Sequence, residues 1–102
     1  MSKKENKAYN SHKKTKILIV DDHFFVRKGL TQLINEESDF MVCAEAENAD
    51  QALEAVDKQH IDLAVIDISL EGTTGIRLSE KIKSRCPNLA VLVLPMSEFL
   101  EK

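Results

Sequence analysis

Several features that define common protein classes are scarce or absent in this chain of 102 residues. Its only cysteines, Cys43 and Cys86, stand far apart in no metal-like spacing, so they predict no disulfide framework and fit a reducing compartment. No apolar stretch approaches the roughly 20 residues that cross a bilayer, and none follows the lysine-rich start as a secretion signal would require. We therefore expect a cytoplasmic protein with no membrane association.

The chain also lacks a strong charge of either sign. Its formal net charge is -3, with no basic excess to suggest nucleic acid and no acidic tract. Apolar residues make up 43% of the sequence, which suffices for a core, and the length suits one small domain. We expect a flexible polar leader over residues 1–15 and a single domain over residues 16–102.

Apolar strands alternate with amphipathic helices along the predicted domain. Asn48 and Gln51 form a capping pair that opens the second helix, and Phe24 and Phe25 are expected to pack in the core and at its rim. The predicted order is strand 17–20, helix 24–35, strand 41–44, a helix from residue 49, strand 63–66, helix 76–85 and strand 91–94. This order predicts an α/β doubly wound parallel sheet, whose functional crevice lies at the carboxyl ends of the strands.

Acidic residues follow two of the predicted strands. Asp21 and Asp22 end the first strand and Asp67 ends the third, so their carboxylates should crowd one edge of the sheet. Like charges at that range repel, and Mg²⁺, which takes oxygen ligands, relieves the repulsion. A carboxylate beside such a metal can attack a phosphoryl group and form an acyl phosphate. Aspartates after strands also cap helices or lie in solvated turns, but the joint pattern favours a phosphoryl-transfer site.

The segments around these aspartates resemble a known family. They are residues 17–23 (ILIVDDH), 27–30 (RKGL), 45–53 (EAENADQAL), 62–70 (DLAVIDISL) with Gly75, and 87–94 (PNLAVLVL). Together they are similar to the receiver domain of bacterial two-component response regulators, NarL/FixJ class, from Lys16 to about Met96. The resemblance implies a flavodoxin-like or CheY-like receiver fold and a signalling module rather than an enzyme.

The resemblance also implies a role for each site residue. Asp67 would accept phosphate from the phosphohistidine of a sensor histidine kinase. Asp22 would bind Mg²⁺ directly, with Asp21 beside it and acting partly through water, and the backbone carbonyl of Ser69 would be a further ligand. His23 is not expected to bind this hard cation, because receivers bind it with oxygen ligands.

The chain departs from the family pattern near its end. Pro95 stands where receivers have Ser or Thr, so the hydroxyl that follows the phosphoryl group is missing. The chain ends at Lys102, before the fifth strand and the lysine that follows it, which implies a truncated receiver with four of five strands and no DNA-binding output domain. The fourth strand would then be an exposed apolar edge that favours a homodimer or aggregation.

Three functions follow from these observations. The leading one is a truncated transcriptional regulator that accepts phosphate on Asp67 in a Mg²⁺-dependent phosphorelay. The alternative is a degenerate receiver that no longer switches and acts only as a protein-interaction module, or a non-functional gene fragment. An enzyme or nucleotide-binder on the same fold is disfavoured, because Asp21-Asp22-His23 stands where a Gly-rich phosphate loop would follow the first strand.

Overall fold

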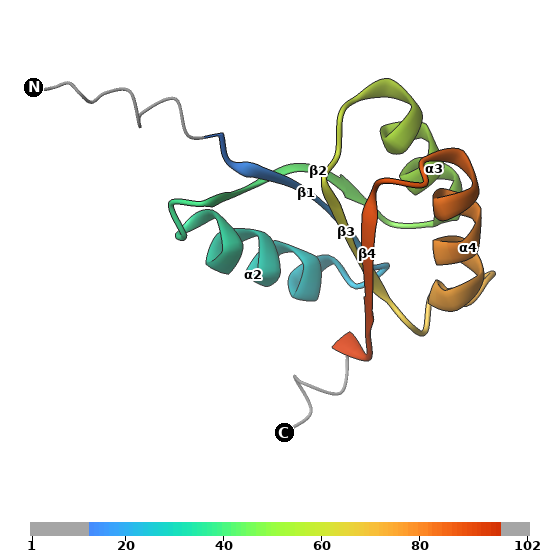
Figure 1. Ribbon diagram of the computed structural model, residues 1–102. Coiled ribbons are helices and arrows are strands. Elements are labelled where there is room, and N and C mark those ends of the chain that lie inside the picture. Colours follow the sequence, from blue (N-terminus) through green and yellow to red (C-terminus); the bar gives the residue numbers. More distant parts are fainter. Residues whose placement is uncertain (1–12, 97–102) are drawn as a thin grey trace, which may run out of the picture.

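The computed structural model describes residues 13–96, which form four strands and three helices (Figure 1). Within these residues the order of elements is the predicted alternation of strand and helix. The elements are β1 (Thr15–Val20), α2 (Phe24–Asn35), β2 (Phe40–Ala46), α3 (Ala49–Lys58), β3 (Leu63–Asp67), α4 (Gly75–Arg85) and β4 (Ala90–Leu94).

The four strands form one parallel sheet in the order β2-β1-β3-β4. The chain runs from β1 outward to β2, returns to the other side of β1 for β3, and continues outward to β4. The direction of winding therefore reverses between β1 and β3, which confirms the doubly wound prediction and marks the carboxyl end of these two strands as the place for a site.

Helices cover both faces of this sheet, with α2 on one face and α3 and α4 on the other (Figure 1). On the α2 face, Ile17 and Ile19 of β1 pack with apolar residues of that helix. On the opposite face, Leu18 and Val20 pack with apolar residues of α3 and α4. Both faces of β1 are thus buried, which explains why its sequence is continuously apolar rather than alternating.

The boundaries of two predicted segments need correction. The predicted leader, residues 1–15, falls mostly outside the described residues, but Thr15 is the first residue of β1 rather than the last of a leader. Its N–H donates to the carbonyl of Asp39 at 2.8 Å, so pairing with a distant segment extends the strand. The second strand, predicted over residues 41–44, spans Phe40–Ala46 and contains a register shift opposite the Ile17–Leu18 step.

The helix signals in the sequence are confirmed at the start of α3. The side chain of Asn48 accepts a hydrogen bond from the Gln51 N–H at 2.9 Å, and the Gln51 side-chain oxygen accepts one from the N–H of Glu47 at 2.9 Å. The start of α4 is capped in the same way, because the Thr74 hydroxyl oxygen accepts a hydrogen bond from Arg77 N–H at 3.0 Å. These bonds satisfy N–H groups that a helix leaves unpaired at its start.

The prediction for the paired phenylalanines was wrong. Phe24 and Phe25 are 55% and 84% exposed, and their rings contact each other edge to face at 5.3 Å between centroids. They occupy the first turn of α2, where the apolar stripe of Val26, Leu30 and Ile34 already faces the sheet. Aromatic character by itself therefore did not decide burial, since helical phase turned both rings away from the core.

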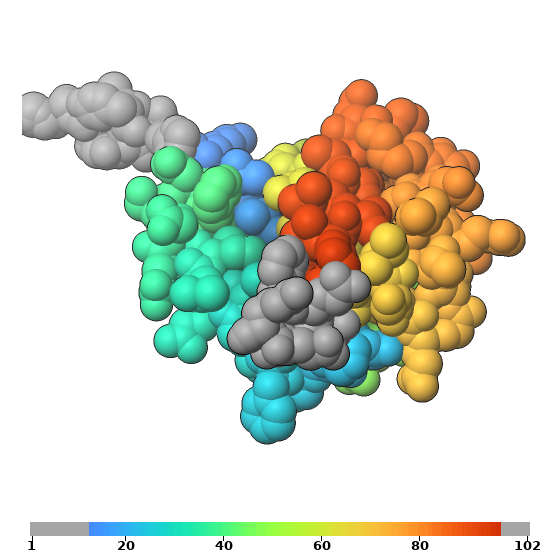
Figure 2. Space-filling model, turned by 90° about the horizontal axis from the view of Figure 1, so that it is seen from below, coloured from blue at the N-terminus to red at the C-terminus, as the bar shows by residue number. Residues whose placement is uncertain are grey.

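Three further sequence predictions concern cysteines, membranes and self-association. Cys43 and Cys86 are both free and half-buried, as expected. Among residues 13–96, no helix has the length and apolarity that crossing a bilayer requires. In the same part of the chain β4 pairs with β3 alone and exposes Leu92. The red segment that contains β4 reaches the molecular surface in Figure 2, and association through this edge stays a prediction.

Candidate functional site

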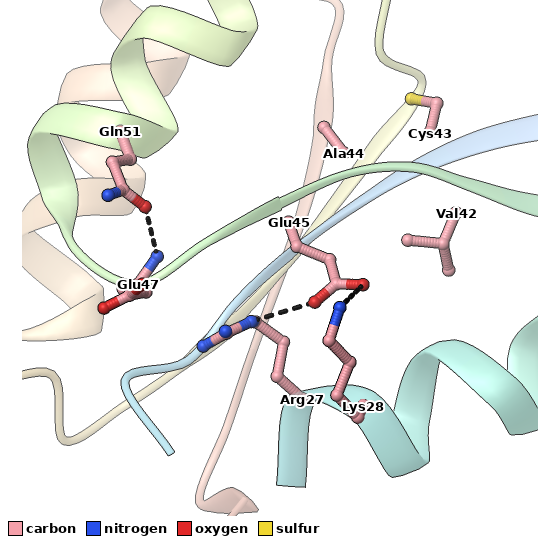
Figure 3. A pocket seen from close by; sticks show the side chains of 8 residues that line it. All are labelled: Arg27, Lys28, Val42, Cys43, Ala44, Glu45, Glu47 and Gln51. Carbon is pink, nitrogen blue, oxygen red and sulfur yellow. Dashed lines mark hydrogen bonds and ion pairs between the residues drawn. The ribbon is translucent and has the colours of Figure 1, made fainter. Parts of the chain in front are cut away.

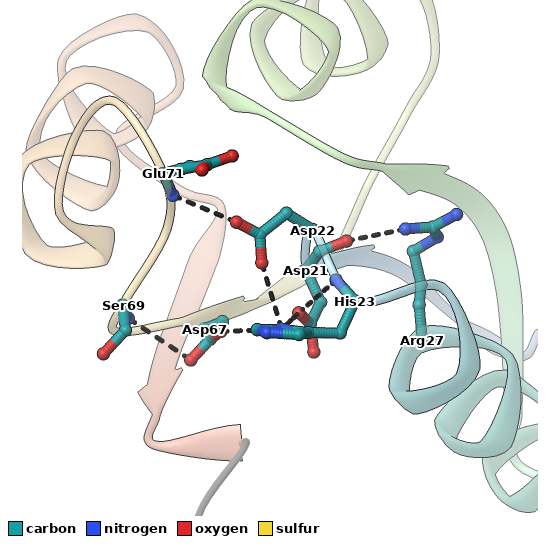
Figure 4. Close-up of polar contacts among 7 residues, drawn as sticks. All are labelled: Asp21, Asp22, His23, Arg27, Asp67, Ser69 and Glu71. Carbon is teal, nitrogen blue, oxygen red and sulfur yellow. Dashed lines mark hydrogen bonds and ion pairs between the residues drawn. The ribbon is translucent and has the colours of Figure 1, made fainter.

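Three aspartates meet at the carboxyl end of the two central strands (Figure 4). Asp21 and Asp22 directly follow β1, and Asp67 is the last residue of β3. Since Val20 of β1 lies in register with Ile66 of β3, the next residues of the two strands emerge side by side. The structure therefore brings together the three carboxylates that the sequence singled out.

These carboxylates are held away from water. Asp21 and Asp67 are fully buried, and the side chain of Asp22 is 22% exposed. Each of the three has one buried oxygen that accepts no hydrogen bond, namely Asp21 Oδ2, Asp22 Oδ1 and Asp67 Oδ2. Buried carboxylate oxygens in proteins are commonly paired with a charged group or coordinate a metal, so these three are candidate ligands for a cation.

The second oxygen of each carboxylate is fixed by a backbone N–H. His23 N donates to Asp21 Oδ1 at 2.9 Å, Glu71 N donates to Asp22 Oδ2 at 3.1 Å, and Ser69 N donates to Asp67 Oδ1 at 3.3 Å. One oxygen of each group is thus tied to the main chain, while the other accepts no hydrogen bond. This division of roles fits a hard divalent cation, which takes carboxylate oxygens one at a time. The carbonyl of Ser69, proposed from sequence as a ligand, stays a prediction.

His23, for which the sequence predicted no role in metal binding, lies among these carboxylates. Its Nδ1 is 2.9 Å from Asp21 Oδ1, 3.0 Å from Asp22 Oδ1 and 3.9 Å from Asp67 Oδ2, while half of the side chain is exposed. The hydrogen bond with Asp21 raises the pKa of His23 above its ordinary value; burial opposes this rise and the three carboxylate charges add to it. The one sequence feature that could have indicated this placement is that His23 directly follows the acidic pair.

Arg27 is a second residue that sequence reasoning missed. This buried side chain donates from Nη1 to the backbone carbonyl of Asp21 at 2.7 Å and from Nε to Glu45 at 2.9 Å. Glu45 lies on β2 between Arg27 and Lys28, beside an open pocket (Figure 3). Burial alone would raise the pKa of Glu45, but hydrogen bonds from Lys28, Arg27 and Thr31 lower it below its usual value. Arg27 therefore positions the turn that carries the acidic pair.

Gly75 fits tightly against the other side of the site. It is the first residue of α4, and its N–H donates to the carbonyl of Ile68 at 3.0 Å. A Cβ at this position would lie 2.9 Å from Ile68 Cα and 3.0 Å from the carbonyl carbon of Asp67. The absence of a side chain at Gly75 thus lets the helix approach the backbone of the acidic strand.

Pro95 directly follows the strand beside Asp67. Leu94, the last residue of β4, lies in register with Asp67, and its carbonyl accepts a hydrogen bond from Ile68 N–H at 2.8 Å. Pro95 is the next residue and carries neither a hydroxyl nor a backbone N–H. The residue that follows β4 beside Asp67 therefore has no group that could donate a hydrogen bond.

Comparison with known proteins shows which family this chain resembles. The family model described as the response regulator receiver domain matches residues 17–101. The chain is 31% identical over 85 residues to the nitrate/nitrite response regulator protein NarL of Escherichia coli, covering 83% of this chain and 39% of the relative. It is 37% identical over 79 residues to the DNA-binding transcriptional activator DevR/DosR of Mycobacterium tuberculosis, covering 78% of this chain and 36% of the relative.

A solved structure of a response regulator is also similar to this chain. The crystal structure of a LuxR-family two-component response regulator from an Aurantimonas species has a TM-score of 0.75 and 31% sequence identity, covering 78% of this chain and 57% of that chain. The chain spans about two fifths of the length of the curated relatives.

Proposed function

This chain belongs to the response regulator receiver domain family, and we propose that its Asp67 accepts a phosphoryl group from the phosphohistidine of a sensor histidine kinase. The observation that carries the proposal is the fully buried Asp67 carboxylate, of which one oxygen is fixed by Ser69 N–H and the other accepts no hydrogen bond. A buried carboxylate oxygen that accepts no hydrogen bond keeps its lone pairs available for attack, and the bond from Ser69 N–H sets the orientation of the carboxylate before the donor arrives.

The transfer needs one bond to form and one to break. An oxygen of Asp67 attacks the phosphorus, the P–N bond of the phosphohistidine breaks, and the departing imidazole keeps the electron pair and takes up a proton. Asp67 then carries an acyl phosphate. Asp21 and Arg27 take no part in bond making; Arg27 holds the backbone carbonyl of Asp21 at 2.7 Å and so keeps the acidic turn in place.

The donor set at this edge fits Mg²⁺, as a hard cation that takes oxygen ligands. Asp22 would hold it directly and Asp21 partly through water, Asp67 would contribute a carboxylate oxygen, and the backbone carbonyl of Ser69 would be a further ligand. When bound, Mg²⁺ neutralises charge on the carboxylates and on the phosphoryl oxygens that approach them. Without it, the incoming phosphoryl group would meet several negative charges in a buried site.

The test is phosphorylation of the 102-residue chain with acetyl phosphate and Mg²⁺, followed by intact-mass measurement. We expect one phosphoryl group on the wild-type chain, none on Asp67→Asn, and strongly reduced labelling of Asp22→Asn or after chelation. Asp57→Asn is the matched control, because that exposed carboxylate pairs with Arg85 outside the site. Labelling of Asp67→Asn at the wild-type level, or labelling that ignores chelation, would overturn the proposal.

One observation favours a second function, that of a receiver that binds partners without switching. Pro95 cannot donate a hydrogen bond to a phosphoryl group on Asp67, so that contact cannot differ between the phosphorylated and free states. Amide NMR spectra with and without beryllofluoride and Mg²⁺ separate the two functions. Shifts confined to the neighbourhood of the three aspartates favour the non-switching module, whereas shifts that spread along β4 favour a working switch.

A further inference from the structure

We propose that His23 adds a nitrogen ligand to the acidic site, so that Zn²⁺ binds there in competition with Mg²⁺ and blocks phosphorylation of Asp67. This inference rests on the proposed function, since it concerns regulation of the same site. The three aspartates and His23 each offer one ligand atom, and these four atoms all lie within 4.8 Å of one another. The cluster therefore holds the number and the kinds of ligand that zinc prefers.

The distances from His23 support a direct bond to a shared ion. Ligands that lie about 2.0–2.2 Å from one zinc ion are at most about 4.4 Å apart. His23 Nδ1 is 3.0 Å from Asp22 Oδ1 and 3.9 Å from Asp67 Oδ2, within that range. All four ligand atoms lie within 4.8 Å of one another, and the half-exposed imidazole of His23 is the ligand group least confined by its surroundings.

The unpaired oxygens distinguish this cluster from an ordinary group of surface acids. Asp21 Oδ2 and Asp67 Oδ2 belong to fully buried side chains and have no hydrogen-bond partner. Their second oxygens are fixed by backbone N–H groups, so neither carboxylate can turn its free oxygen to solvent without losing a bond. Buried carboxylate oxygens that accept no hydrogen bond, together with an accessible imidazole, can act as the ligands of a bound cation.

The two ions differ in what they require. Mg²⁺ demands oxygen ligands in an octahedron and keeps several waters, so it gains little from an imidazole. Zn²⁺ binds imidazole nitrogen well and settles with four protein ligands, which leaves no open position for a phosphoryl oxygen. His23 therefore favours zinc over magnesium, and the zinc-bound site is closed to the phosphodonor.

A simpler role for His23 makes a different prediction. If the imidazole only offsets negative charge, its removal would change the affinities for Mg²⁺ and Zn²⁺ by the same factor. If it is a ligand, His23→Asn loses zinc affinity by at least about tenfold, as even the loss of an outer-shell partner commonly does, and keeps its magnesium affinity. His23→Gln serves as a second variant, and far-UV circular dichroism checks that both fold.

The experiment is calorimetric titration of the full chain with MgCl₂ and, separately, with ZnCl₂, for wild type, His23→Asn and the control His60→Asn. His60 is exposed and pairs with Asp62, away from the cluster. A Co²⁺ spectrum identifies the ligands, because binding through Cys43 or Cys86 would give a thiolate charge-transfer band that nitrogen and oxygen ligands do not.

We expect a fall in the ratio of zinc to magnesium affinity for His23→Asn alone, and no thiolate band. Micromolar ZnCl₂ should inhibit phosphorylation by acetyl phosphate in the wild type and inhibit His23→Asn much less. An unchanged affinity ratio in His23→Asn, or a thiolate band, overturns the inference while Mg²⁺-dependent labelling of Asp67 still stands. Loss of that labelling in the absence of zinc would instead contradict the proposed function.

Discussion

Replacement of Gly75 by alanine tests how closely α4 must approach the strand that carries Asp67. The added Cβ would lie 2.9 Å from Ile68 Cα and 3.0 Å from the carbonyl carbon of Asp67, and closer still to the carbonyl oxygen of Asp67. All three atoms belong to the backbone, so no side chain can rotate away to relieve the contact. The helix, the strand end or both must shift.

The magnitude follows from two opposing effects. Alanine is favoured over glycine in a helix by up to about 1 kcal/mol. Overpacking in a tight interior costs about 1–3 kcal/mol, and the rigid backbone neighbours place Gly75→Ala at the upper end. The hydrogen bond from Gly75 N–H to the Ile68 carbonyl, 3.0 Å in the structure, would also lengthen. We expect a net loss of about 2 kcal/mol, or a melting temperature lower by about 10 °C.

The assay is urea and thermal unfolding followed by circular dichroism. Gly29→Ala is the matched control, because Gly29 lies within α2 and an added Cβ there meets nothing within 4 Å. That change should stabilise the chain by about 0.5–1 kcal/mol through helix propensity alone. If Gly75→Ala matched or exceeded the stability of the wild type, the close approach of α4 to Asp67 would be refuted.

Three other changes test separate parts of the structure. Asn48→Ala removes the cap of α3 and should lower the free energy of unfolding by about 1 kcal/mol, as measured in urea; an unchanged value would contradict the capping role. The lowered pKa of Glu45 means that its stabilisation is full above its ordinary pKa of 4.5 and is lost as the pH falls through the lower folded value. The stability difference between wild type and Glu45→Gln should therefore shrink on acidification, and a growing difference would show the reverse shift. Phe25→Ser should change stability by less than about 0.5 kcal/mol, because that ring is 84% exposed; a larger loss would place it in the core.

The sequence by itself determined the elements and their order. The run over residues 17–20 is continuously apolar, rich in β-branched residues and too short for a typical helix, so it indicated a strand buried on both faces. Asn48 marked a helix start through a purely local bond to Gln51. Asp21 and Asp67 followed such strands, and the topology of alternating strands and helices then placed both at one edge of the sheet.

Contacts between segments far apart in the chain were decided only by the tertiary structure. The extension of β1 to Thr15 depends on the carbonyl of Asp39, and the buried position of Arg27 depends on Asp21 and Glu45. No local pattern encodes these partners, since each residue alone is as compatible with solvent as with burial.

For the same reason, the sequence predicted the positions of the aspartates in the site but not that of the His23 side chain. Its place in the sequence shows that it follows the acidic pair, but not which way the chain turns as α2 begins. That turn brings the imidazole to within 3.9 Å of Asp67, a residue 44 positions away. Strand and helix periods act over a few residues and can be read along the chain, whereas the ligand set of a site depends on side-chain directions that are fixed only when the strands and loops pack together.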